Sequence, residues 1–380
     1  MPTLKDIADR VGVSVAAVSR VLNHDKSFSI TNATRQMILE AAQELQYVPS
    51  ARKQRHPMTV ALVMLYSELE ELEDPYYLSI RANARKEAVR QGYSVLEFFT
   101  PLGHDLQGAG FGNALRQTAG VIVIGSTNSY TPPLREQLIA AGVPVVLADF
   151  WTDEPRWDYV YVDFRTAVNM AMDHLVGMGY ERIGFIGARE RDATTGAELL
   201  DLRERYYEEN RRAAGRYNPA DVIIGKKTSC DEGYALMRQA ISAGGLLPRA
   251  LFVMTDNMAI GAIKALKEDG IAIPEQVAVV GYNDIPAAAY LSPSLTTVRT
   301  RTDLLGVFAH RLLNDRINNE RDIGLRIVAP CELIVRQSSG ITSPADTSHA
   351  PGGAATEPGD ATTVVAAAAD ADGAVTAGGG

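Results

Sequence analysis

Cysteine is scarce in this 380-residue chain, which has only Cys230 and Cys331. The two stand far apart, without CxxC spacing or a histidine partner in the sequence, which argues against a disulfide framework and against a zinc site. No apolar run is long enough to span a bilayer. The N-terminal segment MPTLKD lacks the charged-then-apolar pattern of a secretory signal. We therefore expect a cytoplasmic protein with two reduced, structural thiols.

Motifs for catalysis are also missing. The six histidines are scattered along the chain, and none belongs to an HExxH pattern. The segments GFIG and VIVIG lack the GxGxxG or GxxxxGK[ST] spacing that cradles phosphates. We expect neither catalytic residues nor a cofactor or metal ion, so that an enzyme is the weaker interpretation of the sequence.

Positive charge is in short supply overall, because 46 acidic residues outnumber 37 basic ones for a net charge of −9. Residues 1–57 differ from the rest, with eight basic and five acidic side chains, which gives 8 − 5 = +3 and leaves −12 for the remainder. A polyanion would be tolerated by the N-terminal segment and repelled by the body. An excess this small also arises by chance, so charge alone does not decide the function.

The N-terminal 47 residues contain three helical patterns and no strand pattern. The first is Leu4–Val11, and the second is Val15–Asn23, for which Ser14 is an N-cap. Thr31 or Asn32 can cap a third helix, in which apolar residues recur at helical spacing up to Leu45. A basic, proline-bounded segment, PSARKQRHP, follows as a linker.

From Thr59 onward, short β-rich runs such as TVALVMLY, GVIVIGS, RIGFIG and VAVVGYN alternate with amphipathic helical stretches. This alternation is typical of parallel, doubly wound sheets. Eight or nine such units exceed one ordinary sheet, and we therefore expect two subdomains. The chain would return through SPSLTTVRTRTDLLGVFAHRLL and finish in one strand within GLRIVAPCELIVRQS.

After about Ile341 the sequence is rich in Ala, Gly, Pro and Thr and has no basic residue. Such a composition cannot form a core, so we expect a disordered tail over 341–380. The tail also lacks the leucine heptads of a coiled coil.

The helix predicted at VGVSVAAVSRVLN begins with small side chains, whereas a core helix usually carries large apolar residues from its first turn. Together with the preceding helix and a turn at Gly12, this pattern is typical of a helix-turn-helix. Val15, Ala16 and Ala17 would let the second helix approach base edges in the major groove, and Arg20 suits a bidentate contact with guanine. The alternative is a small helical pair that only packs on the body.

The blocks TLKDIADRVGVSVAAVSRVLN, TRQMILEAAQELQYVP, LFVMTDNMAIGAIKAL and GIAIPEQVAVVGYNDIP stand in an order that resembles the lactose/galactose-repressor family of bacterial transcription regulators. The likeness covers residues 2–339. It implies an N-terminal all-α helix-turn-helix domain followed by an α/β, periplasmic-binding-protein-like effector domain of two doubly wound subdomains. Two blocks, YSELEELEDPYYLSIR and NDIPAAAYLSPSLTTVR, are most similar to a repressor of a β-galactosidase operon.

The resemblance implies these domain limits. The DNA-binding domain would span 1–57 with a hinge at 48–57, and the effector-binding and dimerisation domain would span 58–340. Its N-subdomain would comprise about 58–160 and 290–323, and its C-subdomain about 161–289 and 324–340.

The resemblance also implies a set of DNA-contacting residues, in which Val15, Ala16 and Arg20 fall where the family reads bases. The Val-Ala pair is that of galactose-type members. The full set is Leu4, Lys5, Ser14, Val15, Ala16, Ser19, Arg20, Asn23, Thr31, Thr34, Tyr47, Ser50, Ala51, Arg52 and Lys53. The hinge departs from the family, because Ser50 replaces an asparagine and His56 stands in place of the leucine that enters the minor groove.

A cleft at the carboxyl ends of the strands would hold the effector. A sugar ring requires carboxylate, guanidinium and aromatic groups, which hydrogen-bond its hydroxyls and pack on its C–H faces. Asp149, Arg203 and Asn283 are the main candidates. The expected set is Tyr66, Tyr76, Tyr77, Asp149, Arg203, Thr255, Asp256, Asn283 and Asp284, although Asp256 is also a plausible helix cap and Tyr77 a plausible core residue. Many sugar-binding relatives have an aromatic residue where this chain has Thr228.

These features predict a homodimeric, effector-controlled repressor that binds double-stranded operator DNA and a sugar such as galactose, lactose or a related galactoside. A co-repressor response, in which the ligand strengthens DNA binding, stays open. The third hypothesis is a sugar-binding protein that does not bind DNA, and the N-terminal helices argue against it.

Overall fold

The computed structural model describes residues 2–22, 28–45, 47, 59–100, 109–189, 191, 196–319 and 321–340. In the described part of the chain, no helix is both long and apolar enough to cross a membrane. Two of the expected regions, the hinge at 48–57 and the tail at 341–380, lie outside these residues.

The N-terminal unit consists of three helices, α1 (Leu4–Val11), α2 (Val15–Leu22) and α3 (Asn32–Glu44). Thr3 begins α1 with a capping box, in which its hydroxyl accepts from the Asp6 amide and the Asp6 carboxylate accepts from Thr3. Gly12 ends α1 at a φ of +73°, the left-handed conformation that glycine adopts without strain. The positive φ expected for the turn is therefore present.

The first lobe is built on a six-stranded sheet in the order β11-β5-β4-β3-β1-β2. All of its pairings are parallel. The strands are β1 (Thr59–Met64), β2 (Ser94–Phe99), β3 (Gly120–Ile124), β4 (Val145–Ala148), β5 (Asp158–Val162) and β11 (Arg326–Ala329). Near-continuous apolar runs such as VALVM are buried throughout, as in a sheet covered on both faces.

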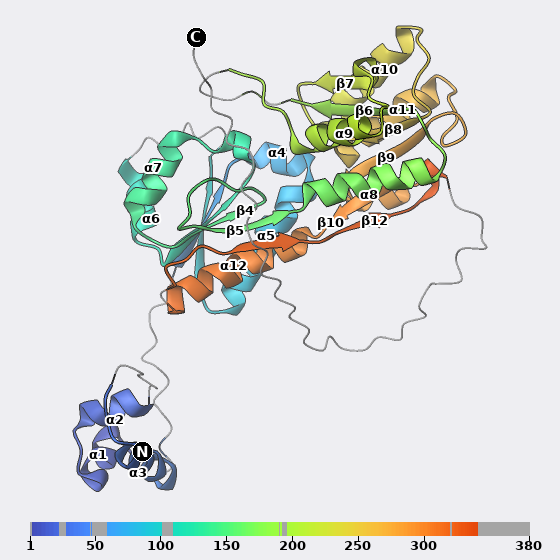
Figure 1. Ribbon diagram of the computed structural model, residues 1–380. Coiled ribbons are helices and arrows are strands. Elements are labelled where there is room, and N and C mark those ends of the chain that lie inside the picture. Colours follow the sequence, from blue (N-terminus) through green and yellow to red (C-terminus); the bar gives the residue numbers. More distant parts are fainter. Residues whose placement is uncertain are drawn as a thin grey trace, which may run out of the picture. The chain divides into compact units, whose positions relative to one another are not determined.

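Helices cover both faces of this sheet (Figure 1). One apolar cluster joins the strands to α5 (Pro75–Arg90) and α12 (Thr302–Asn319), and a separate cluster joins them to α6 (Ala109–Arg116) and α7 (Pro132–Ala141). A short helix, α4 (Glu68–Glu73), precedes α5. The lobe is thus doubly wound.

The second lobe has a six-stranded sheet in the order β12-β10-β9-β8-β6-β7. Its strands are β6 (Ile183–Ala188), β7 (Val222–Gly225), β8 (Ala250–Val253), β9 (Ala278–Asn283), β10 (Thr296–Thr300) and β12 (Cys331–Ile334). Only β12 runs antiparallel to its neighbour among these strands. The helices are α8 (Phe164–Gly177), α9 (Leu202–Ala213), α10 (Cys230–Ser242) and α11 (Asp256–Glu268).

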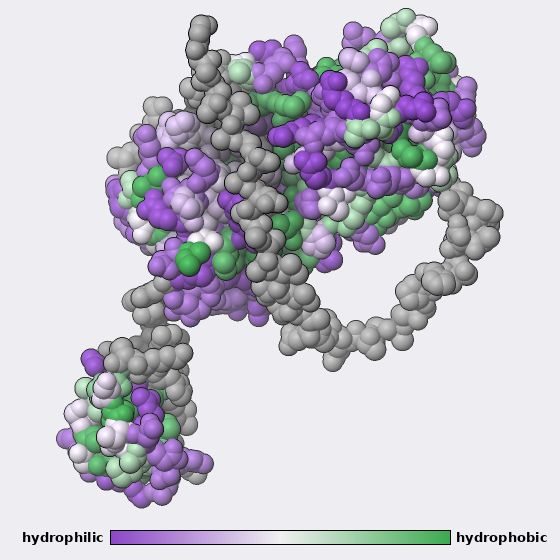
Figure 2. All heavy atoms as spheres, in the orientation of Figure 1, coloured by the Kyte–Doolittle hydropathy of each residue, from purple (hydrophilic) through white to green (hydrophobic). Residues whose placement is uncertain are grey.

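Four short 3₁₀ turns complete the described chain, η2 (Thr127–Ser129), η3 (Pro219–Asp221), η4 (Pro286–Tyr290) and η5 (Gln337–Ser339). Hydrophilic residues occupy most of the lobe surface drawn in Figure 2, with apolar residues in scattered patches.

The chain passes between the lobes for the last two times at positions that differ from the expected subdomain limits, 290–323 and 324–340. Residues 296–300 form β10 of the second sheet, where they pair with β9 and β12, and Thr297 donates to the buried Asp256 carboxylate at 2.6 Å. Residues 326–329 form β11 of the first sheet, beside β5. The single final strand that we expected is two strands in two sheets, divided at Pro330, whose missing N–H interrupts the ladder.

Candidate functional site

The N-terminal helices leave one side of α2 exposed. Val18 and Val21 are buried with Ile7 of α1 and Ile38 of α3. Val15, by contrast, has 44% of its surface exposed. Ala16 and Arg20 are exposed as well, whereas Ala17 is buried, so our expectation that Ala17 also lies bare was wrong. The reason is helical spacing, which places Ala17 on the same side as the core residue Val21.

Hydroxyl groups fix the starts of two of these helices. The Ser14 hydroxyl accepts from the Ala17 amide at 3.1 Å and so caps α2. The Thr31 hydroxyl accepts from the Thr34 amide at 3.2 Å and lies 2.7 Å from the Thr34 hydroxyl. The Arg20 guanidinium lies 5.3 Å from the centre of the Phe28 ring. These contacts hold the exposed polar groups of the unit in place.

The other expected DNA contacts vary in their accessibility. Lys5 is exposed, and Leu4, Ser19 and Tyr47 are half-buried. Five further candidates lie outside the described residues, namely Asn23, Ser50, Ala51, Arg52 and Lys53.

A cavity of about 330 Å³, here called the cleft cavity, is lined by residues of both lobes. The first lobe contributes aromatic, acidic and hydroxyl side chains, and the second contributes the Arg203–Asp201 pair together with polar and apolar side chains. Six of the nine expected effector residues line it: Tyr76, Tyr77, Asp149, Arg203, Thr255 and Asn283.

Asp149 follows β4 and is the acidic centre of the first-lobe wall. Its carboxylate accepts a hydrogen bond of 2.8 Å from the Tyr76 hydroxyl. Burial raises the pKa of Asp149 to about 7, against the opposing effects of the Tyr76 hydrogen bond and the Arg203 charge. A carboxyl group with such a pKa exchanges its proton near neutrality and both donates and accepts hydrogen bonds there.

Arg203 is the basic centre of the second-lobe wall. Its Nε and Nη2 donate to the two carboxylate oxygens of Asp201 at 2.8 and 2.9 Å, and its Nη1 donates to the Met254 carbonyl at 3.1 Å. The guanidinium also lies 5.3 Å from the centre of the Tyr282 ring. Burial opposes the charge on Asp201, yet the charge of Arg203 lowers the pKa of that carboxyl below its usual value. The guanidinium is therefore held in one orientation.

Backbone strain concentrates at the strand ends beside the cleft cavity. Among the described residues other than glycine, only Asp149, Asn283 and Asp284 have positive φ, at 76°, 113° and 55°. Such conformations cost roughly 1–3 kcal/mol each and cluster at functional sites. The Asn283 Oδ1 is buried without a hydrogen-bond partner in the described structure. This oxygen lies on a cavity-lining residue, where a donor of a ligand would satisfy it.

Three expected effector residues lie outside the cleft cavity. The Tyr66 hydroxyl donates to Glu71 at 3.2 Å, and its ring stacks on that of Tyr77 at 4.7 Å. Asp256 has no exposed surface, since it accepts from Thr297 and from the Ile285 amide. The Asp284 carboxylate pairs with Arg299 and Arg336, each at 2.7 Å. All three side chains are occupied by structural contacts, which a sequence pattern does not reveal.

Several cavity-lining residues were missed. Asp74 and Asp201 cap α5 and α9 by accepting from the amides of Tyr76 and Arg203. An aspartate just before Pro75 or before the LRERYY helix was a recognisable capping signal. The others lie in loops, in a short 3₁₀ turn or at the first residue of a helix, and gave no comparable signal: Ser126, Thr127, Asn128, Phe150, Phe164, Leu200, Leu202 and Met254.

Two family models match the chain. The one described as "Bacterial regulatory proteins, lacI family" covers residues 3–50, and a periplasmic binding protein-like domain covers 172–339. The HTH-type transcriptional repressor MelR of Bacillus subtilis (strain 168) is 36% identical over 354 residues, 90% of this chain and 99% of the relative. The HTH-type transcriptional regulator GalR of Lacticaseibacillus casei is 36% identical over 341 residues, 89% of this chain and 100% of the relative.

Solved structures agree with this assignment. The transcriptional regulator CelR in complex with cellobiose has 30% identity and a TM-score of 0.64, with 89% of this chain and 100% of that one covered. The Lac repressor dimer bound to operator and the anti-inducer ONPF has a TM-score of 0.61 at 22% identity, covers 90% and 99%, and supports the fold. With a helix-turn-helix unit and two α/β lobes enclosing a polar cleft, this chain belongs to the lacI family of DNA-binding transcriptional regulators.

Proposed function

We propose that the protein is a homodimeric repressor of carbohydrate-utilisation genes, and that a galactoside in the cleft cavity releases it from its operator. The observation that carries the proposal is the pairing of Asp149 from one lobe with Arg203 and Asn283 from the other around one cavity. A ligand that bonds to both walls holds the lobes in one arrangement, and coupling of about 1–3 kcal/mol to DNA binding suffices for a switch.

The choice of a galactoside rests on sequence. YSELEELEDPYYLSIR and NDIPAAAYLSPSLTTVR resemble the repressor of the evolved β-galactosidase operon, and Val15-Ala16 is the pair of galactose-type members. The aromatic wall supports a sugar of any kind, because Trp151, Tyr76 and Tyr77 line the cavity although Thr228 replaces an aromatic residue.

For DNA binding, we propose that Val15, Ala16 and Arg20 reach base edges, and that Leu4, Lys5, Ser14, Ser19, Asn23, Thr31, Thr34, Tyr47 and residues 50–53 contact the backbone or the minor groove. The exposure of Val15, Ala16 and Arg20 supports their part. A bidentate contact from arginine to guanine is worth about 1–3 kcal/mol.

Paired variants test both halves of the proposal, on an operator selected from a random duplex pool. Arg20→Ala should weaken operator binding by roughly 5- to 150-fold and leave sugar binding unchanged. Asp149→Ala should abolish the response to sugar and leave DNA affinity without sugar unchanged. Equal loss of both activities in either variant would contradict the separation of the two sites.

The sign of the response is tested in the same assay. Release of the operator on addition of lactose or galactose supports the inducer mechanism proposed here. Tighter operator binding on addition of sugar would show the co-repressor mechanism in its place.

A further inference from the structure

A second cavity, of about 390 Å³ and here called the edge cavity, lies in the second lobe at the carboxyl ends of β6 and β7. One wall comes from the connection between β6 and α9, which contains an antiparallel bridge between Arg191 and Glu198. This connection, from Arg189 to Asp201, is longer than the roughly two to six residues usual in such units, and long loops are commonly functional.

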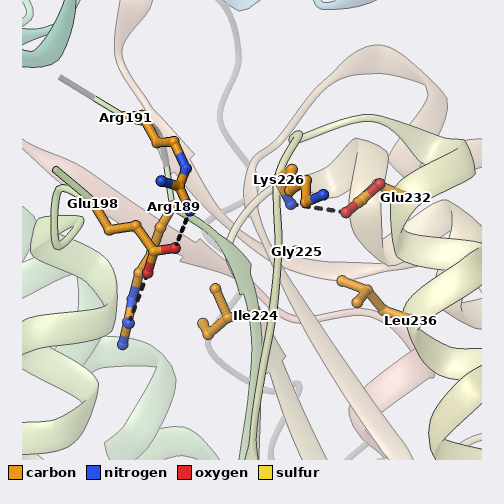
Figure 3. Close-up of a pocket in the computed structure, with 8 residues that line it drawn as sticks. All are labelled: Arg189, Arg191, Glu198, Ile224, Gly225, Lys226, Glu232 and Leu236. Carbon is orange, nitrogen blue, oxygen red and sulfur yellow. Dashed lines mark hydrogen bonds and ion pairs between the residues drawn. The ribbon is translucent and has the colours of Figure 1, made fainter. Parts of the chain in front are cut away.

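The edge cavity presents polar groups from two sides (Figure 3). Arg189, Arg191 and Glu198 lie on the side of the β6–α9 connection, and Lys226 and Glu232 lie on the side of β7 and α10. The side chains of Ile224 and Leu236 add apolar surface to the lining. Hydrogen-bonding groups beside an apolar surface suit a ring that has hydroxyls at its edge and C–H groups on its faces.

Charges in and around this cavity are balanced. Arg189 donates to the carboxylate oxygens of Glu204 at 3.0 and 2.6 Å, and Arg191 donates to Glu198 at 2.8 Å. Glu232 accepts from the backbone amide of Lys226 at 2.7 Å, and the Lys226 ammonium adds a third positive charge to the three carboxylates in and around the cavity. A phosphate group would have to compete with carboxylates that already hold the arginines, so the lining favours a neutral, hydroxyl-rich ligand.

The edge cavity lies close to the cleft cavity. Glu198 and Lys226 line the former, and Leu200 and Thr228, each two residues further along the chain, line the latter. Two residues span at most about 7 Å. Asn283 and Thr255 lie at the carboxyl ends of β9 and β8. The edge cavity lies at the carboxyl ends of β6 and β7, the next two strands in the sheet. With strands about 4.8 Å apart, the two centres are separated by about two strand spacings, roughly 10 Å.

We propose that the edge cavity is a subsite for a second sugar unit, and that the effector is therefore an oligosaccharide of at least two units. The proposal rests on the proposed function, because the first unit occupies the cleft cavity. Two adjoining polar cavities along one sheet edge accommodate a disaccharide, whereas a monosaccharide fills only one of them.

Calorimetric titration of the full chain tests this inference with matched sugars: galactose against lactose, galactose against melibiose, and glucose against cellobiose. In the series that binds, the disaccharide should bind at least about tenfold more tightly than its monosaccharide. Glu198→Gln and Lys226→Ala, two changes at the edge cavity, should remove most of that difference and leave monosaccharide affinity unchanged. Unchanged monosaccharide binding shows in the same titration that the variants are folded.

Lys264→Ala, an exposed position on α11 outside both cavities, is the matched control and should behave as the parent chain. Equal affinity for the monosaccharide and the disaccharide would overturn the inference while leaving the proposed function intact. So would edge-cavity variants that weaken both sugars equally. Absence of binding by every sugar would instead overturn the proposed function and the inference with it.

Discussion

The two walls of the cleft cavity are built from different chemistry. The first lobe offers the rings of Tyr76, Tyr77 and Trp151 with two carboxyl groups, Asp74 and Asp149, whereas the second offers the Arg203–Asp201 ion pair with Asn283. A sugar needs both kinds of surface, one for its C–H faces and one for its hydroxyls. The division between the lobes means that neither lobe alone makes a complete site, so ligand binding and lobe arrangement are coupled.

Replacement of Arg203, which lies in the second-lobe wall, should have the largest combined effect on stability and sugar affinity. Arg203→Ala leaves Asp201 as a mostly buried, unpaired carboxylate, which costs roughly 3 kcal/mol of unfolding free energy. Sugar affinity should fall at least about tenfold, because hydrogen bonds from a charged donor are lost. Chemical denaturation and sugar titration measure the two effects. Arg203→Lys keeps the charge, and if it bound sugar as well as the parent chain, the bidentate geometry would be unimportant.

The carboxyl group of Asp149 should make the stability of the protein depend on pH. Burial raises the pKa of Asp149 to about 7 from 3.8, so the folded state binds more protons than the unfolded state between pH 4 and 7. Its contribution to stability is complete below the unfolded pKa and is lost as pH rises through the folded one. At about 1.4 kcal/mol per pKa unit, that loss is of the order of 4 kcal/mol.

Asp149→Asn should remove this part of the pH dependence. Denaturation from pH 4 to 8 measures it as the difference between parent chain and variant, which cancels the contributions of Asp256 and His310. Parallel stability curves for the two proteins would show that Asp149 is ionised in the folded state at all these pH values.

Replacement of the aromatic ring of Trp151 should have a smaller effect on sugar affinity. Trp151 lines the cavity, and its ring centre lies 4.7 Å from that of Tyr161. Trp151→Leu keeps an apolar side chain but removes the ring, and sugar should bind about 2- to 10-fold more weakly, since aromatic contacts are worth about 0.5–1.5 kcal/mol. Loss of affinity as large as that of Arg203→Ala would mean that stacking dominates over hydrogen bonding.

The hydroxyl that links Tyr76 to Asp149 should matter least. Tyr76→Phe removes the 2.8 Å hydrogen bond that lowers the pKa of Asp149, so that this pKa rises further. The pH-dependent loss of stability should shift upward by less than about one unit. The same denaturation series detects the shift, and a shift downward would contradict the assigned hydrogen bond.

Helices and strands followed from the sequence where the pattern is local. The helix expected at Leu4–Val11 has those bounds, and the one expected from Val15 begins at that residue as α2. The caps Ser14 and Thr31 were also identifiable, because a side-chain oxygen before a helix acts within three residues. The division of GLRIVAPCELIVRQS between two sheets was not predicted, since the partner strands lie far away in the sequence.

For the cleft cavity, the strand ends identified from the sequence predicted several of the lining residues. Asp149 and Asn283 directly follow or end buried runs, and the carboxyl ends of parallel strands meet at one edge. Asp256 and Asp284 have the same sequence signal, yet Thr297, Arg299 and Arg336 occupy their carboxylates. A one-residue step along a turn decides which side chain faces a cavity and which faces the core.

By itself, the sequence determined the helix-turn-helix, the alternation of strands and helices and the family, because each depends on short-range spacing and on residues read in order. Only the tertiary structure decided which polar side chains remain available, where the two last strands lie, and that the cleft cavity is lined from both lobes. These properties depend on partners far apart in the sequence, such as Asn257, whose side chain donates to the Glu73 carbonyl at 3.1 Å across 184 positions of the chain.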